Sequence, residues 1–370
     1  MRGSIVKKSK KYYIVLSFYD ESGKRKQKWI SGFDKKAEAV KELPRYVQEI
    51  HDGFYINLDN ITLEKYLEAY KSDYVSPNLS KNSYEKLITA ANKINPHIGK
   101  IKLHKIKPLH IQSMVNEWNK EQQMKPGTIQ TYMRVLSSAM QQAIKWQLIT
   151  YNPCKAVTGP RIEHNSLSIL TGDQIQILLA ASKETPIYPV IMLALMTGMR
   201  RGEILGLQWH NVDLANGRIF VEHNLVKAGN DIILKDTKTS SGKRSVDISI
   251  KLTHFLKMLS IQQKENALRF GKDYTHNTYV CKYPDGTIFR PDYVPKKFKK
   301  ILTEASLPQL RFHDLRHTHA SMLLLAGENP KVIQERLGHS SIKITLDTYS
   351  HLVPSMQKSA ADRMESMVDF

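Results

Sequence analysis

Residues 313–317 read His-Asp-Leu-Arg-His, a set of side chains that could hold either a metal ion or a phosphate. Two histidines four positions apart, with an acidic residue second, match the spacing of a helical zinc motif. However, Asp314 is one carbon shorter than the glutamate that such a motif uses as general base, and Arg316 would lie beside a divalent cation. Because spacing also places no convincing third ligand, we expect no metal and no other cofactor.

An anionic ligand fits the same segment better. His313 and Arg316 lie three positions apart, so on a helix they share one face and could grip one phosphate together. The other polar residues have simpler expected tasks. We expect His317 to pack within the helix, His319 to be structural or solvated, and Asp314 to cap the helix or orient a neighbour.

Two further candidates follow downstream, in the segment LGHSSIKITLDTYSHL. A helix starting near Asn329-Pro330 is predicted to end at Gly338, with His339 as the first residue beyond it. Tyr349 follows in a stretch that is itself predicted to be helical. A histidine after a helix-ending glycine is usually structural, and the chain has 17 tyrosines, so neither residue alone indicates chemistry.

An arginine pair lies upstream, in TGMRRGE (197–203). An apolar helix is predicted to break at Thr197-Gly198, and Arg200-Arg201 to open a new helix. Glu203 lies three positions after Arg200 and could hold its guanidinium in place. An arginine this close to leucine and isoleucine needs a charged or hydrogen-bonding partner, or it has a functional role. A purely structural Arg–Glu pair is the alternative, and periodicity does not choose between the two arginines.

The elements that would position these residues belong to a region from about residue 168 onward. It begins with helices, passes through a β-rich stretch from Arg218 to Ile250 and returns to helices. Residues 161–167 are polar and lack periodicity, so we expect a linker there. Turns are predicted in the β-rich stretch at Gly217, Gly229-Asn230 and Ser241-Gly242.

Residues 58–160 are predicted to be entirely helical. Thr62 is the expected N-cap of one helix, and Thr128 that of another. Asn152-Pro153 is expected to end this second helix. A bundle of this kind could be a binding module or a scaffold, and its sequence alone says little about function.

Residues 1–55 are predicted to form a small α+β unit. One strand covers residues 12–19, a second passes through Trp29, and a helix runs from an Asp34 cap to about Ile50 with a kink at Pro44. A two- or three-stranded ribbon fits a DNA major groove, although a solvated basic surface would have the same composition. The basic residues expected to contact DNA are Lys7, Lys8, Lys10, Lys11, Lys24, Arg25, Lys26 and Lys28.

The composition of the chain favours a polyanionic partner, with nucleic acid as the default. Among 370 residues, 55 Lys or Arg outnumber 35 Asp or Glu, which gives a net charge of +20. The longest apolar run, residues 188–196, is far shorter than the roughly 18 residues that span a membrane. Cys154 and Cys281 form neither a disulfide framework nor a thiolate cluster, and no signal peptide is recognisable, so we expect a reducing cytoplasm.

Four motifs taken in order, TGMRRGE, TKTSSGKR, HDLRHTHA and LGHSSIKITLDTYSHL, resemble the tyrosine recombinase (phage integrase) family. The resemblance is strong over residues 168–353. Earlier residues are similar to the core-binding and arm-binding domains of integrases from phages and conjugative elements. The resemblance implies a multidomain, mainly helical chain with small sheets. Its expected parts are a small α+β arm-binding domain (1–56), an all-helical core-binding domain (57–160), a linker (161–167), and a mixed α/β catalytic domain (168–370) with a tail (354–370).

The resemblance also implies a role for each candidate residue. Arg200 and Arg316 match the two family arginines, which would clamp the oxygens of the phosphate under attack. His339 would add a hydrogen bond to the same phosphate. Tyr349 matches the nucleophile, which would form a 3′-phosphotyrosine, and His313 would take its proton.

One lysine is assigned by resemblance alone. Lys238, in TKTSSGKR, matches the lysine on the turn between two strands and would protonate the departing 5′ oxygen. Lys235 and Lys243 lie nearby, and a lysine on a hairpin is usually just solvated.

For the whole molecule, the resemblance implies a site-specific recombinase that integrates or excises a phage or mobile element in a bacterial host cell. Four protomers would assemble on two double-stranded DNA sites, with core-type and arm-type sequences, helped by a host DNA-bending protein and an excisionase. The tail after Pro354 would dock on a neighbouring protomer. A type IB topoisomerase and a non-enzymatic helix-turn-helix regulator are the alternatives.

Overall fold

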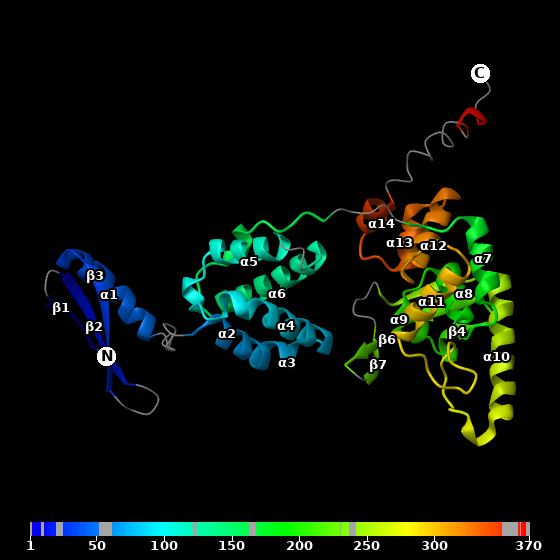
Figure 1. Cartoon of the computed structure of the whole chain (residues 1–370), viewed down its shortest axis with the longest axis horizontal. Coiled ribbons are helices and arrows are strands. Elements are labelled where there is room, and N and C mark those ends of the chain that lie inside the picture. Colours follow the sequence, from blue (N-terminus) through cyan, green and yellow to red (C-terminus); the bar gives the residue numbers. More distant parts are fainter. Residues whose placement is uncertain are drawn as a thin grey trace. The chain divides into compact units, whose positions relative to one another are not determined.

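Helices dominate the computed structural model of this chain, with small sheets in both of its compact units, residues 1–163 and 164–370 (Figure 1). The predicted fold class is therefore confirmed. Among the described residues, no helix is both long and apolar enough to cross a membrane. The structure describes residues 2–8, 11–19, 25–51, 61–120, 124–162, 168–229, 231–236, 242–349, 362 and 364–367.

The N-terminal residues form a three-stranded antiparallel sheet covered on one face by a helix. Strand β2 (Lys11–Tyr19) pairs with β1 (Arg2–Lys8) on one side and with β3 (Arg25–Phe33) on the other. Helix α1 (Lys36–His51) includes Pro44, and its Ala39 packs against Ile14 and Leu16 of β2. The predicted ribbon therefore has three strands and not two. Strand β1, whose only large apolar residues are Ile5 and Val6, pairs with β2 and completes the sheet.

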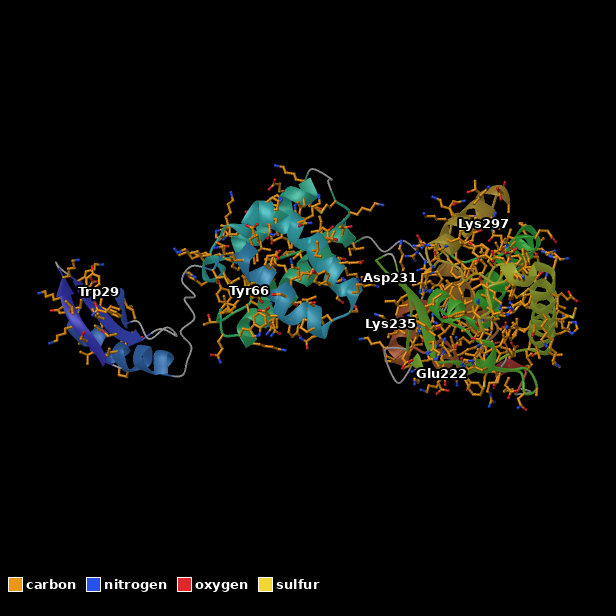
Figure 2. All side chains as sticks on the ribbon, turned by 90° about the horizontal axis from the view of Figure 1, so that it is seen from below. Trp29, Tyr66, Glu222, Asp231, Lys235 and Lys297 are labelled. Carbon is orange, nitrogen blue, oxygen red and sulfur yellow. The ribbon has the colours of Figure 1, made fainter. Side chains whose placement is uncertain are left out.

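The rest of the first unit is a helical bundle. Its core includes Tyr66, Trp118 and Met140 from three different helices, and the Tyr66 hydroxyl donates to the Ala139 carbonyl at 2.5 Å (Figure 2). Thr62 caps the first helix as predicted, by accepting from the Lys65 amide. The helices are α2 (Leu63–Tyr70), α3 (Ser76–Asn78), α4 (Lys81–Ile94), α5 (Pro108–Lys120) and α6 (Pro126–Lys145).

Helix α6 begins and ends earlier than its sequence pattern predicts. Pro126 opens it, with Lys125 as N-cap, so the prediction that Thr128 is the cap was wrong. Proline at the first position presets a helical φ, which favours this start. The predicted end at Asn152-Pro153 was also wrong, because Gln147 adopts a left-handed φ of 58° and the Leu148 amide donates to Ala143.

The second unit combines helices with two small sheets. Strands β4 (Val212–Asp213), β5 (Arg218–Val221) and β8 (Arg244–Asp247) form one sheet, and β6 (His223–Ala228) pairs with β7 (Asp231–Asp236) in a hairpin. The helices are α7 (Gly172–Ser182), α8 (Tyr188–Thr197), α9 (Arg201–Leu205), α10 (Ile250–Phe270), α11 (Tyr293–Glu304), α12 (Asp314–Leu325), α13 (Pro330–Leu337) and α14 (Ile342–Tyr349).

Helix α8 is apolar around most of its circumference, and six of its ten residues are buried in this unit. Helix α12 packs against it. Ala320 and Leu324 of α12 in turn pack against Ile333 and Leu337 of α13. This packing brings the start of α12, the end of α8 and the end of α13 to one place.

Candidate active site

The end of α8 turns sharply at Gly198, as the sequence predicted. Gly198 has a left-handed φ of 66°, and Arg200 occupies the cap position of α9. A Cβ atom at residue 198 would lie 2.6 Å from atoms of both His319 and Leu337. The absence of a side chain therefore lets α12 and α13 approach this turn closely.

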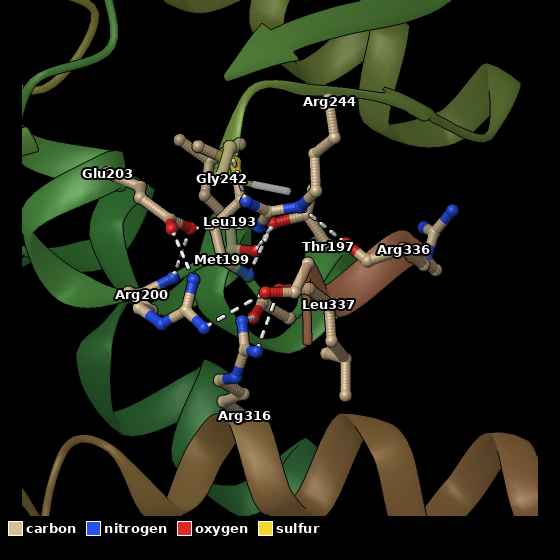
Figure 3. Close-up of polar contacts among 12 residues, drawn as sticks. Leu193, Thr197, Met199, Arg200, Glu203, Gly242, Arg244, Arg316, Arg336 and Leu337 are labelled. Carbon is tan, nitrogen blue, oxygen red and sulfur yellow. Dashed lines mark hydrogen bonds and ion pairs between the residues drawn. The ribbon is translucent and has the colours of Figure 1, made fainter. Parts of the chain in front are cut away.

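Arg316 connects that turn to the end of α13. Its side chain is buried, with 3% of the residue exposed, and it donates to the Gly198 carbonyl at 2.8 Å and to the Leu337 carbonyl at 2.7 Å (Figure 3). Since both acceptors are backbone oxygens at chain reversals, the guanidinium is held in one orientation before any ligand arrives.

Arg200 lies at the same turn but is partly exposed. Its Nη1 donates to Glu203 Oε1 at 2.7 Å, so the predicted Arg200–Glu203 pair is present. Its Nη2 donates to the Gly338 carbonyl at 3.2 Å. With 39% of its side chain exposed, the guanidinium can still meet an anion from solution.

Glu203 is the buried anchor of this arrangement. Its Oε2 accepts from the Arg200 amide at 2.9 Å and from Arg244 Nη2 at 2.8 Å. Burial alone raises the pKa of this carboxyl, but the Arg244 hydrogen bond and the charges of Arg244 and Arg200 lower it below its usual range. Glu203 is therefore a carboxylate at neutral pH.

His339 follows the helix-ending Gly338, whose φ is 66°, as predicted. Its Nδ1 lies 2.8 Å from the hydroxyl of the buried Thr345. Burial, and then the charges of Arg316 and Arg200, lower the pKa of His339 to about 4. The ring is therefore neutral near pH 7, and when Thr345 donates to Nδ1 the ring proton is on Nε2, available to a phosphate oxygen.

His313 occupies the cap position of α12, just ahead of the helix. Its ring lies 5.2 Å from that of His317 in an edge-on arrangement. Although His313 reaches solvent, desolvation and the nearby His317 and Arg316 lower its pKa. A neutral imidazole at this place can accept a proton.

The remaining polar residues of the segment have structural roles. Buried His319 bonds through Nδ1 to the Leu195 carbonyl at 2.7 Å and accepts at Nε2 from Arg336 at 3.1 Å, so its role is structural and it is not solvated. Asp314 orients a neighbour, because its carboxylate accepts from the backbone amide and the guanidinium of Arg311. Sequence reasoning missed Arg336, whose contacts are all distant along the chain.

Two predicted catalytic residues are described less fully. Lys238 belongs to residues 237–241, which lie outside the described residues. The alternative Lys235 lies in β7, opposite Asn224 of β6 (Figure 2). Tyr349 is the last residue of α14, and its backbone alone is described.

The predicted DNA contacts of the N-terminal sheet are described in part. Lys10 and Lys24 lie outside the described residues, and Arg25, Lys26 and Lys28 are described as strand backbone in β3. The Lys7 ammonium lies 5.6 Å from the Tyr12 ring centre, and that of Lys8 lies 6.0 Å from Trp29. The Lys11 ammonium is 3.7 Å from Asp34.

The site as a whole is suited to an anion. The guanidiniums of Arg200 and Arg316 meet at backbone oxygens of the turn that leads to His339. Within the described residues, no group of three His, Cys, Asp or Glu side chains is arranged to hold a metal ion. Positive charge and hydrogen-bond donors are what a phosphate group undergoing substitution requires.

Family models match three separate ranges of the chain. The model described as the phage integrase family matches residues 168–356, more than half of the 370 residues. The phage integrase N-terminal SAM-like domain matches residues 62–119, and an arm DNA-binding domain matches residues 4–50.

Individual proteins are similar over much of the chain. The ICEBs1 integrase of Bacillus subtilis is 30% identical over 65% of this chain and 66% of its own length. A tyrosine recombinase XerC-like protein of Caldanaerobacter subterraneus is 28% identical over 98% of both chains.

Two solved structures share the fold. The Tn1549 transposon integrase in complex with transposon right end DNA has a TM-score of 0.70 and 21% identity, covering 82% of this chain and 99% of that one. A λ integrase tetramer bound to a Holliday junction has a TM-score of 0.59 and 19% identity, covering 91% of this chain and 92% of that one.

Proposed function

The chain belongs to the phage integrase family of tyrosine recombinases, and we propose that it integrates and excises a mobile element by breaking and rejoining DNA through a 3′-phosphotyrosine. The observation that carries this proposal is the meeting of Arg200 and Arg316 at the turn before His339. That arrangement suits a phosphate whose negative charge increases during substitution.

Tyr349 is the proposed nucleophile. Its phenolic oxygen forms a bond to the scissile phosphorus while the bond from phosphorus to the 5′ oxygen breaks. The bond energy is retained in the tyrosyl phosphate, and a phenol with a pKa of about 10 leaves more readily than an alkoxide when the strand is resealed. His313 takes the tyrosine proton, and Lys238 gives a proton to the departing 5′ oxygen.

Arg200 and Arg316 bind the non-bridging oxygens of this phosphate, and His339 adds a hydrogen bond from Nε2. Because these donors are already held by Glu203 and by backbone carbonyls, little reorganisation is needed when the charge develops. Loss of one such donor costs about 3–4 kcal/mol of barrier, a hundred- to a thousandfold in rate.

The assembly proposed for this chain is a tetramer on two DNA sites in a bacterial cell. The tetrameric λ integrase and the basic N-terminal sheet support it. We assign core sites to residues 57–160 and 168–370, joined by a linker at 161–167, and arm sites to residues 1–56. A host DNA-bending protein and an excisionase would set the direction of the reaction, and the tail (354–370) would dock on a neighbouring protomer.

The experiment uses a substrate carrying the element's own junction with a nick close to the cleavage position. After cleavage, the short piece that carries the free 5′ hydroxyl diffuses away, so the strand cannot be resealed. Wild type and Tyr349→Phe are compared on a denaturing gel, with Tyr151→Phe, an exposed tyrosine elsewhere, as control. A covalent band with wild type and the control but not with Tyr349→Phe is expected. If DNA is bound but no protein gives the band, the helix-turn-helix regulator is favoured instead.

A topoisomerase gives the same covalent band, so a second assay separates it. Recombination between two attachment sites on separate molecules is expected, with no relaxation of a supercoiled plasmid that lacks the sites. Efficient relaxation without any exchange of DNA ends would favour the type IB topoisomerase.

A further inference from the structure

Arg244, the first residue of β8, lies next to the candidate site and contacts three chain segments (Figure 3). Its Nη2 donates to Glu203 Oε2 at 2.8 Å, its Nε to the Arg336 carbonyl at 2.7 Å, and its Nη1 to the Gly242 carbonyl at 3.4 Å. These segments are the start of α9, the end of α13 and the backbone just after residues 237–241.

The Arg244–Glu203 ion pair is almost completely enclosed. Only 7% of the arginine side chain and 4% of the glutamate side chain are exposed. An ion pair taken out of water gains little net stability, yet removing one partner leaves the other as an uncompensated buried charge. The pair therefore fixes geometry more than it adds stability, and Arg244 is too enclosed to be a surface contact to DNA.

Glu203 transmits this contact to the reacting phosphate. One carboxylate oxygen faces Arg244 and the other faces Arg200 Nη1, so the orientation of the carboxylate sets that of the Arg200 guanidinium. Arg244 binds the carbonyl of Arg336, and Arg316 binds the carbonyl of the next residue, Leu337. Arg200 is thus connected to Arg244 through Glu203 alone, and Arg316 is connected to it through the adjacent residues Arg336 and Leu337.

We propose that Arg244 is a positioning residue, which holds the Glu203 carboxylate so that Arg200 faces the phosphate and which ties this pair to the turn carrying His339. The inference deepens the proposed function and rests on it. Arg244 acts through Glu203 and never touches the phosphate, which distinguishes it from the two clamp arginines.

The test is the rate of covalent complex formation with Arg244→Gln on the nicked substrate. The rate is expected to fall about 10- to 100-fold, as for loss of a buried hydrogen bond to a charged group, with DNA affinity unchanged. Arg218→Gln is the matched control, since Arg218 pairs with Asp247 in the same sheet and has 46% of its side chain exposed.

The pH profile separates positioning from a general structural defect. Arg200 and Arg244 are the charged groups that face Glu203. Without Arg244, burial raises the pKa of Glu203, so in Arg244→Gln the rate should fall further as the pH decreases. Wild type and Arg244→Lys, which keeps the charge, should lack this additional fall.

A double mutant checks that the effect passes through Glu203. Arg244→Gln combined with Glu203→Gln should be no slower than Glu203→Gln alone. Additive losses, or a wild-type rate and pH profile in Arg244→Gln, would overturn the inference. If Arg244→Gln does not fold, Arg244→Lys takes its place: lysine keeps the charge but lacks the planar fork, so it should slow the reaction in the wild-type background and not in the Glu203→Gln background. A slowing that persists in the Glu203→Gln background would overturn the inference equally. Absence of any covalent complex with wild type would instead overturn the proposed function.

Discussion

At the scale of single residues, the arginines of the site donate mainly to backbone oxygens. Arg316 binds two carbonyls, Arg336 binds those of Asp247 and Met196, and Arg200 binds one. Backbone acceptors at fixed turns hold a guanidinium without neutralising its charge. Arg316 therefore keeps its positive charge, and the one carboxylate of Glu203 is shared between Arg200 and Arg244, so the proposed clamp retains net positive charge for a phosphate.

Arg316→Lys tests this geometry, because lysine keeps the charge but cannot reach Gly198 and Leu337 with one planar fork. We expect covalent complex formation to fall about a hundred- to a thousandfold, with DNA affinity retained. The control is Arg311→Lys. Arg311 lies two residues before His313, the N-cap of the same helix, and 77% of its side chain is exposed. An Arg316→Lys protein that cleaves as fast as wild type would contradict the clamp.

His319 makes stability depend on pH. Burial, then the charge of Arg336, lowers its pKa from 6.5 to about 4. Between these values the unfolded chain binds more protons than the folded one, so this contribution to stability is present above pH 6.5 and is lost as the pH falls toward 4. The loss amounts to at most about 3 kcal/mol.

Urea unfolding of the full chain at about pH 7.5 and about pH 5 measures this dependence. His319→Gln, which removes the titrating ring, should be less stable at the higher pH but should lose less stability than wild type between the two. An equal loss in both proteins would show that other groups produce the dependence.

At the scale of elements, the turn between α8 and α9 positions both arginines of the clamp. Gly198→Ala is expected to destabilise the second unit by about 2–4 kcal/mol, because a left-handed φ is unfavourable for alanine and its Cβ would overlap with buried side chains. Hydrogen exchange of α8 and α12 peptides measures the effect. Gly172→Ala is the control, since nothing lies within 4 Å of its Cβ position. Equal protection in both variants would show that the close packing at residue 198 does not matter for stability.

Sequence patterns predicted the local parts of the site well. The glycines that end α8 and α13 and the Arg200–Glu203 pair are each determined within a few residues. Arg244 was missed because its two shortest hydrogen bonds are to residues 41 and 92 positions away, and such contacts leave no periodic pattern in the sequence. The true start and end of α6 were missed because Pro126 at its start and the left-handed Gln147 after its end override the apolar repeat.

At the scale of the whole molecule, the net charge of +20 is expected to make DNA binding depend strongly on salt. Replacing Lys7, Lys8 and Lys11 by glutamine should weaken binding to arm-type DNA and lower the slope of log K against log salt by up to about 3, if each lysine contacts one phosphate. Cleavage of core-site DNA should be unaffected.

The matched control for the sheet lysines is the exposed set on α10, Lys251, Lys257 and Lys264, replaced in the same way. It removes the same charge from another place. Binding by titration at several salt concentrations compares the two triple variants. Equal losses of arm-site affinity would show that only net charge matters and that the N-terminal sheet has no special role.

Tyr349 is proposed to carry the DNA during the reaction. The most direct measurement is mass spectrometry of the covalent complex after digestion with nuclease and protease. We expect a peptide containing Tyr349 with a nucleotide attached through its 3′ phosphate. A nucleotide on any other residue, or attached through a 5′ phosphate, would contradict it.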